Sequence, residues 1–211
     1  MDKKTLLNKL TERYPALQSC ITEVEAAADS IIECYQNGGK LLICGNGGSA
    51  ADADHIVGEL LKSFSKKRPV KPEFTDDLKG VSDERGTILS EKLERGLPAI
   101  SLNAHAALIS AISNDIGGEF IYAQQVLGYG NKDDILIGIT TSGNSQNIID
   151  AAITAKAKGM KVIGLTGETG GNLKQYCDVS IRVPSGITPV VQEYHLPVYH
   201  ILCQIVEHHF Y

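Results

Sequence analysis

Apolar residues recur at three- and four-residue steps through the first part of the chain. In residues 4–36 this spacing places leucine, isoleucine, valine and alanine on one face of a helix. Pro15 removes a backbone donor inside that pattern and should divide it into two helices. Gly38 and Gly39 then supply the helix stop. We therefore expect residues 1–36 to form an added helical segment ahead of the main fold.

Short apolar runs alternate with longer helical patterns over the rest of the chain. The runs expected as buried strands cover residues 40–44, 98–102, 134–139, 161–165 and 179–183. The helices expected beside them cover residues 50–64, 104–113, 119–127, 146–158 and 192–209. This alternation favours an α/β fold, here a three-layer, doubly wound, mostly parallel five-stranded sheet in one domain, 1–211. Ligands of such sheets bind beyond the carboxyl ends of the strands.

Residues 65–97 depart from this alternation. They contain Pro69, Pro72 and charges of both signs, and we interpret them as an insertion with one helix near 86–95. One interpretation of the insertion is a solvated loop. The other is a segment that covers or borders the active site.

Composition narrows the functional classes. The net charge of −5 argues against nonspecific nucleic-acid binding, which needs a basic face. No apolar run approaches the length of a membrane span, and the charged start of the chain is unlike a signal peptide. Five scattered cysteines without a CxxC pair suit reduced thiols, so we expect a cytoplasmic protein that binds neither nucleic acid nor membrane.

Hydroxyl groups cluster directly after the apolar run 135–138. Thr140, Thr141, Ser142 and Ser145 precede the helix that is expected from residue 146. The first N–H groups of a helix are unpaired, and the helix dipole favours an anion there. Because none of the four side chains is cationic, this turn suits a small phosphorylated metabolite better than a nucleotide or a polyanion.

A glycine-rich turn follows the first expected strand and includes Asn46, Gly47 and Ser49. It resembles the dinucleotide pattern GxGxxG loosely, with Ala50 in place of the third glycine. A nucleotide site is one alternative, although no acidic residue closes a second strand nearby. We favour a turn that contacts a phosphate or a sugar.

Histidines and a carboxylate supply candidate chemistry on two helices. His55 and Glu59 are four residues apart and share a helix face. A surface ion pair is the alternative, but their apolar neighbours indicate a packed helix. His200 also has apolar neighbours, so a buried core histidine is its alternative. Gln192 lies eight residues before His200, about 12 Å along a straight helix, so either Gln192 precedes the helix or the two serve different pockets, for example in neighbouring subunits.

Together these motifs resemble the SIS (sugar isomerase) fold and, within it, the phosphoheptose isomerases. The resemblance runs from about residue 22 to the C-terminus, except for 65–97. It implies that the hydroxyl turn binds phosphate, that the glycine-rich turn and Gln192 contact substrate, and that Asp115 is an active-site carboxylate. It implies an acid/base pair of Glu59 and His200. The zinc ligands implied for metal-containing members are His55, Glu59, Gln192 and His200.

The implied reaction converts sedoheptulose 7-phosphate, a ketose, into the aldose glycero-manno-heptose 7-phosphate through an enediol. Zinc would polarise the carbonyl. In bacteria such a product supplies heptose for surface polysaccharide. The resemblance also implies a homotetramer with shared active sites, and the long first and closing helices carry more apolar residues than one small sheet needs.

Two other functions stay open from the sequence. One is a noncatalytic module that binds a phosphosugar or a replication initiator, as in relatives of these isomerases, although retention of His200 with Glu59 favours catalysis. The other is an isomerase or lyase for a different sugar phosphate. Many members carry an acidic residue three positions before the glutamine, where this chain has Pro189, so the exact sugar is open.

Overall fold

The computed structural model describes all 211 residues and contains one parallel sheet. Its five strands lie in the order β2-β1-β3-β4-β5, and every neighbouring pair is parallel. The strands are β1 (Leu41–Gly45), β2 (Ala99–Ser101), β3 (Ile135–Thr140), β4 (Lys161–Thr166) and β5 (Val179–Arg182). Each predicted strand is therefore confirmed, with ends that differ by one residue at most.

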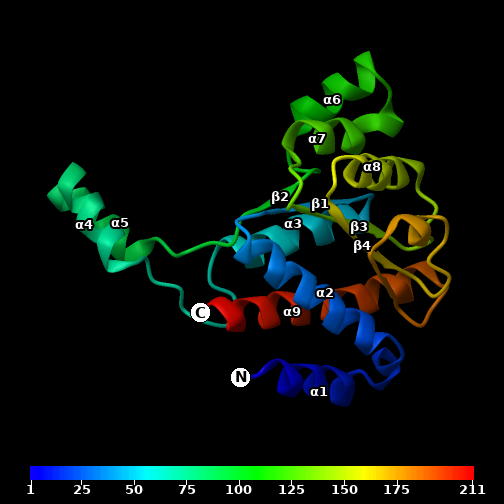
Figure 1. Cartoon of the computed structure of the whole chain (residues 1–211), viewed down its shortest axis with the longest axis horizontal. Coiled ribbons are helices and arrows are strands. Elements are labelled where there is room, and N and C mark those ends of the chain that lie inside the picture. The colour runs from blue at the N-terminus through cyan, green and yellow to red at the C-terminus, as the bar shows by residue number, and fades with distance from the viewer.

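Helices cover both faces of the sheet (Figure 1). Pro15 opens a short 3-10 helix, Pro15–Cys20, between the first two α-helices, so the predicted break is confirmed. The α-helices are α1 (Lys3–Arg13), α2 (Ile21–Gln36), α3 (Gly48–Leu61), α4 (Pro72–Val81), α5 (Asp83–Lys92), α6 (Ala106–Asp115), α7 (Ile121–Tyr129), α8 (Gln146–Ala157) and α9 (Thr188–Phe210).

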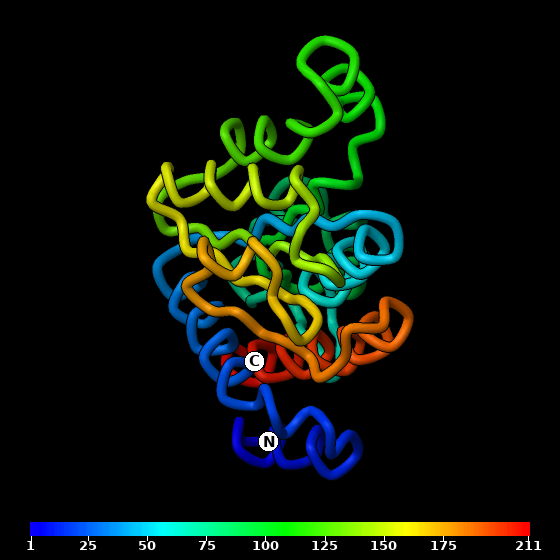
Figure 2. Tube along the Cα trace, turned by 90° about the vertical axis from the view of Figure 1, so that its right-hand side faces the viewer, coloured from blue at the N-terminus to red at the C-terminus, as the bar shows by residue number.

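Alternate side chains of each strand enter two separate cores, because successive residues of a strand point to opposite faces. Leu41 and Ile43 join α2, α3 and α9 in a core of 32 buried residues. Leu42 and Cys44 join α7 and α8 in a core of 14. Figure 2 shows the layers stacked, with α8 on one side of the sheet and α2 and α9 on the other. The predicted three-layer, doubly wound architecture is confirmed.

Helix α1 forms a further layer outside α9 (Figure 2). Leu6, Leu7 and Leu10 are buried in the larger core, which includes the inner face of α9. The apolar residues of the first and closing helices thus cover each other within one chain. The sequence predicts assembly from the many apolar residues of these two helices. Because the two helices bury those residues against each other, their number alone does not indicate an oligomer.

Residues 65–97 form an arm that projects from the body (Figure 1). The arm holds two helices, α4 and α5, so the prediction of one helix near 86–95 missed α4. Ser82 separates them because its backbone ends α4 and its hydroxyl accepts a hydrogen bond from the Arg85 N–H at the start of α5. No residue of α4 is buried. The arm is solvated, but it is helical and not a loop.

Helix α9 begins at Thr188, four residues before the predicted start, with Pro189 in its first turn. It continues past Pro197, which lies inside the helix. Gln192 therefore lies inside the helix and does not precede it. None of the helices is both long and apolar enough to span a bilayer.

His195, on α9, is fully buried, and neither ring nitrogen has a hydrogen-bond partner. Burial lowers the pKa of His195 to about 4. A histidine in an unfolded chain has a pKa of about 6.5. As the pH drops from 6.5 towards 4, the unfolded chain is protonated at His195 before the folded protein is, so the free energy of unfolding falls. Between pH 7.5 and pH 5.5 we expect the wild type to lose about 1 kcal/mol more unfolding free energy than His195→Leu. Urea titrations of both proteins at the two pH values measure this difference, and equal losses would contradict it.

Candidate active site

The carboxyl ends of β1 and β3 lie side by side where the topology of the sheet reverses. β1 pairs with β2 on one side and with β3 on the other, an arrangement that opens a ligand crevice in doubly wound sheets. The turns after β1 and β3 meet here, since Asn46 and Asn147 exchange two side-chain hydrogen bonds of 2.9 Å. The glycine-rich turn and the hydroxyl turn therefore belong to one region.

The hydroxyl turn leads from β3 into α8. Thr140 ends the strand, and its Oγ1 lies 3.0 Å from the Oγ of Ser145. Ser145 is the N-cap residue of α8, yet its side chain makes no hydrogen bond to the first helical N–H groups. Thr141 and Ser142 lie between them, and Ser142 Oγ accepts a hydrogen bond from the Asn144 N–H. The N-terminus of α8 therefore keeps backbone donors available to an anion.

Gly143 determines the shape of the hydroxyl turn. Its φ is +70°, and an added Cβ would overlap the carbonyl oxygen of Gly170. The Leu173 N–H donates to the Gly143 carbonyl at 2.9 Å, and the Asn172 N–H donates to Asn144 Oδ1 at 3.0 Å. The segment after β4 thus braces the hydroxyl turn, as a preorganised anion site requires.

Two residues that the sequence analysis did not single out hold the glycine-rich turn. The Tyr122 hydroxyl donates to the Gly45 carbonyl at 2.5 Å and lies 3.2 Å from Asn46 Oδ1. Asn103 Nδ2 donates to the same carbonyl at 2.8 Å. Asn103 directly follows the strand predicted at 98–102, so its place at the carboxyl edge was a usable signal. Tyr122 carries no such signal.

His55, Glu59 and His200 gather where α3 faces α9. His55 Nε2 lies 3.1 Å from Glu59 Oε1, and the centroids of the His55 and His200 rings are 5.1 Å apart. The Glu59 side chain is only 13% exposed. Burial lowers the pKa of His200. A shielded carboxylate beside a neutral imidazole can move protons between neighbouring substrate atoms.

Gln192 and Asp115 lie apart from this cluster in the single chain. Gln192 Nε2 is packed against Gly48, where an added Cβ would come within 2.5 Å. Since Gly48 opens α3, Gln192 lies at the glycine-rich turn and not beside His200. Asp115 is exposed at the end of α6 and accepts a hydrogen bond from Asn114. Of the two alternatives from the sequence, Gln192 before the helix or Gln192 and His200 in different pockets, only the second agrees with a single protomer.

An open groove of about 380 Å³ runs between α1 and α9 and reaches His200. Its wall also carries Lys9, Arg13, Tyr14 and Gln204. Its size is in the range of small-molecule pockets. The groove therefore gives a polar ligand, or part of a neighbouring subunit, access to His200.

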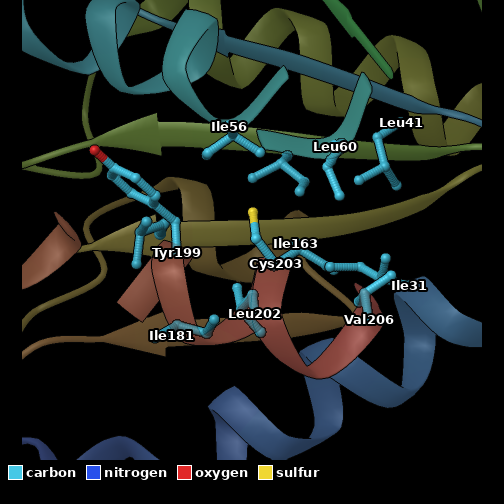
Figure 3. A pocket seen from close by; sticks show the side chains of 12 residues that line it. Ile31, Leu41, Ile56, Leu60, Ile163, Ile181, Tyr199, Leu202, Cys203 and Val206 are labelled. Carbon is cyan, nitrogen blue, oxygen red and sulfur yellow. The ribbon is translucent and has the colours of Figure 1, made fainter. Parts of the chain in front are cut away.

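The apolar cavity in Figure 3 is a feature of the core and not a sugar site. Its volume is about 20 Å³, and all 12 residues that line it are hydrophobic. They include Ile56 and Leu60 of α3 and Tyr199 and Cys203 of α9. A phosphosugar needs hydrogen-bond donors and acceptors, which this cavity lacks.

The cluster of His55, Glu59 and His200 contains the kinds of side chain that bind zinc. Zinc binds imidazole nitrogen and carboxylate oxygen, which His55, Glu59 and His200 supply. His200 Nε2 is buried without a hydrogen-bond partner, as an unused ligand atom would be. No group of three or more His, Cys, Asp or Glu side chains is already arranged around one metal position. The three residues supply the donor types that zinc binds, whereas Gln192 lies about two helical turns before His200 on α9.

Comparison with known proteins places this geometry in a family. The model of the SIS domain matches residues 7–96 and 86–167. Phosphoheptose isomerase of Burkholderia pseudomallei is 42% identical over 188 residues, which cover 89% of this chain and 82% of the relative. The corresponding protein of Helicobacter pylori is 41% identical over 196 residues, 92% of this chain and 88% of the relative.

Solved structures agree with the sequence matches. A phosphoheptose isomerase from Francisella tularensis superposes with a TM-score of 0.75 at 34% identity, covering 98% of each chain. One from Neisseria gonorrhoeae gives a TM-score of 0.73 at 31% identity, covering 97% of each chain. These matches confirm the predicted SIS fold. The chain belongs to the SIS-domain family of phosphoheptose isomerases.

Proposed function

We propose that this protein interconverts sedoheptulose 7-phosphate and glycero-manno-heptose 7-phosphate. The observation that carries the proposal is the cluster of His55, Glu59 and His200 on a chain of this family. Isomerisation needs a base for the proton next to the carbonyl and a second group for the oxygen protons. The cluster offers both kinds of group within one small volume.

In this mechanism Glu59 removes the proton from carbon 1 of the ketose, and an enediol forms between carbons 1 and 2. His200 moves a proton between the two oxygens. Glu59 then returns a proton to carbon 2, which completes the aldose without net loss of atoms or charge. The pKa of His200, lowered by burial, keeps the imidazole neutral and able to accept a proton near neutral pH.

The phosphate of the sugar is proposed to bind at the N-terminus of α8. Thr140, Thr141, Ser142 and Ser145 supply neutral donors there, and the helix dipole adds a partial positive charge. The Asn46–Asn147 contact joins this turn to the glycine-rich turn. Asn46, Gly47, Ser49 and Gln192 are therefore proposed to contact the sugar hydroxyls.

His55, Glu59 and His200 would hold a zinc ion, with Gln192 as a fourth ligand only if a neighbouring subunit supplies it. Zinc, when bound, would polarise the substrate carbonyl as a Lewis acid. A homotetramer with shared sites would also explain the distance of Asp115 from the cluster. Light scattering at micromolar concentration tests this assembly, and a monomer would contradict it.

NMR of the purified protein with sedoheptulose 7-phosphate tests the proposed function. We expect the aldose to form, with a rate that falls on chelation and recovers on addition of zinc. If the protein binds the phosphosugar without turnover, the proposal is wrong and a sensing role gains support. Conversion of a different ketose phosphate only would retain the reaction and overturn the substrate.

Ser145→Ala should weaken binding of the phosphate with little effect on the fold, because the Ser145 side chain does not cap α8. Loss of one neutral hydrogen bond predicts a KM that rises about 3- to 10-fold at nearly constant kcat. Steady-state kinetics measure both constants. Ser90→Ala, on the arm, is the matched control and should leave both unchanged. A fall in kcat with no change in KM would contradict the phosphate role.

A further inference from the structure

Tyr199 joins the apolar core to the proposed catalytic cluster. Its ring lines the core cavity, and Figure 3 shows its hydroxyl pointing away from the other lining side chains. That hydroxyl lies 3.0 Å from His55 Nδ1. The other ring nitrogen of His55, Nε2, faces Glu59 Oε1 at 3.1 Å. Both nitrogens of His55 are thus engaged, one by Tyr199 and the other by the proposed base.

Asp52 lies near the Tyr199 hydroxyl. It lies three residues before His55 on α3, which places both side chains on neighbouring parts of one helix face. Tyr199, His55 and Glu59 therefore form a polar chain between α3 and α9, and Asp52 lies near its Tyr199 end.

We propose that Tyr199, backed by Asp52, is a positioning residue that orients His55 and selects the nitrogen it presents to the catalytic cluster. The Tyr199 ring is buried among the apolar side chains of the larger core, so the hydroxyl meets Nδ1 from a fixed direction. The imidazole is then held with Nε2 towards Glu59. The part of this inference that concerns zinc rests on the proposed function.

A phenol suits this place because its hydroxyl both donates and accepts. With a proton on His55 Nε2, that nitrogen donates to Glu59, and Tyr199 donates to Nδ1. For Nε2 to offer its lone pair to zinc, the proton must be on Nδ1. The Tyr199 oxygen then accepts a hydrogen bond from the Nδ1–H, and its own hydroxyl hydrogen is free to turn towards the nearby Asp52 carboxylate. The same contact thus serves both tautomers, and the outer partner of a histidine ligand typically changes metal affinity about 10- to 100-fold.

Tyr199→Phe tests this inference, because it keeps the buried aromatic ring and removes only the hydroxyl. In the metal-free wild type, the ¹⁵N resonance of His55 Nδ1 should show an accepted hydrogen bond, and the variant should lose that signature. Zinc affinity, from competition with a chromogenic chelator, should fall about 10- to 100-fold. Asp52→Asn should reproduce part of this fall.

Tyr35→Phe is the matched control, since the Tyr35 hydroxyl is also buried but has no hydrogen-bond partner. It should change neither the His55 resonance nor zinc affinity. Unchanged values in Tyr199→Phe, equal losses in both variants, or a wild type that does not bind zinc would overturn the inference. If the Tyr199 effects appear but the wild type isomerises no ketose phosphate, the proposed function fails and the positioning role stands.

Discussion

Replacing Glu59 by glutamine should reduce kcat for the heptose phosphate by about 10³-fold, within the usual range for loss of a catalytic acid or base. Glutamine keeps the size of the side chain and an oxygen that can accept from His55 Nε2, which now lies 3.1 Å from Glu59 Oε1. It cannot accept a proton from carbon. Steady-state kinetics with sedoheptulose 7-phosphate measure the loss, and thermal unfolding checks that the fold is retained.

Glu73→Gln is the control for this substitution, since Glu73 is an exposed glutamate on the arm helix α4. It should leave kcat and KM as they are. A Glu59→Gln enzyme with more than about a tenth of wild-type kcat would remove Glu59 from the role of base.

Replacing Glu207 by glutamine should lower the free energy of unfolding by about 3–5 kcal/mol, because it leaves a buried arginine without its counter-charge. Arg68 Nε donates to Glu207 Oε1 at 2.7 Å, and both side chains are fully buried. The same carboxylate accepts the N–H groups of Phe64 and Ser65 at 2.9 and 2.7 Å. Burial opposes the charge of Glu207, but hydrogen bonds from Ser65, Phe64 and Arg68 outweigh it and lower the pKa.

Glu33→Gln is the matched control for the buried pair. Glu33 and Lys161 form an ion pair at 2.6 Å, but their side chains are 59% and 49% exposed. Loss of such an exposed pair costs about 0–1 kcal/mol. Urea titrations of both variants give the comparison. Equal, small losses would mean that Arg68–Glu207 does not hold the base of the arm against α9.

The sheet and most helices could be predicted because burial leaves a periodic trace in the sequence. Strands β1, β3 and β4 are runs of mainly apolar residues, and α2 shows its buried face as Val24, Ala27, Ala28 and Ile31. Helix α4 also has apolar residues at helical spacing, Phe74, Leu78 and Val81, but the prolines and mixed charges around it favoured an insertion with a single later helix, so α4 was missed. The start of α9 was wrong by four residues, since Thr188 and Pro189 open it without an apolar pattern.

The candidate site could be predicted only as far as its residues stand in local motifs. The two turns and the His55–Glu59 pair are short in sequence, so spacing and chemistry revealed them. Tyr122, Arg68 and Tyr199 act through partners that are 77, 139 and 144 positions away, and no local spacing records such contacts. The sequence left open whether Gln192 precedes the last helix, and this depended on where α9 begins, which the folded chain shows to be Thr188.

The most direct test of the central claim is the exchange of hydrogen between the sugar and the solvent. Wild-type protein would be incubated with sedoheptulose 7-phosphate in D₂O, in parallel with Glu59→Gln, and deuterium would be followed by NMR. An enediol formed by Glu59 predicts deuterium at carbon 2 of the aldose with the wild type and almost none with the variant. Equal exchange by both proteins, or no exchange by a wild type that binds the sugar, would contradict the account.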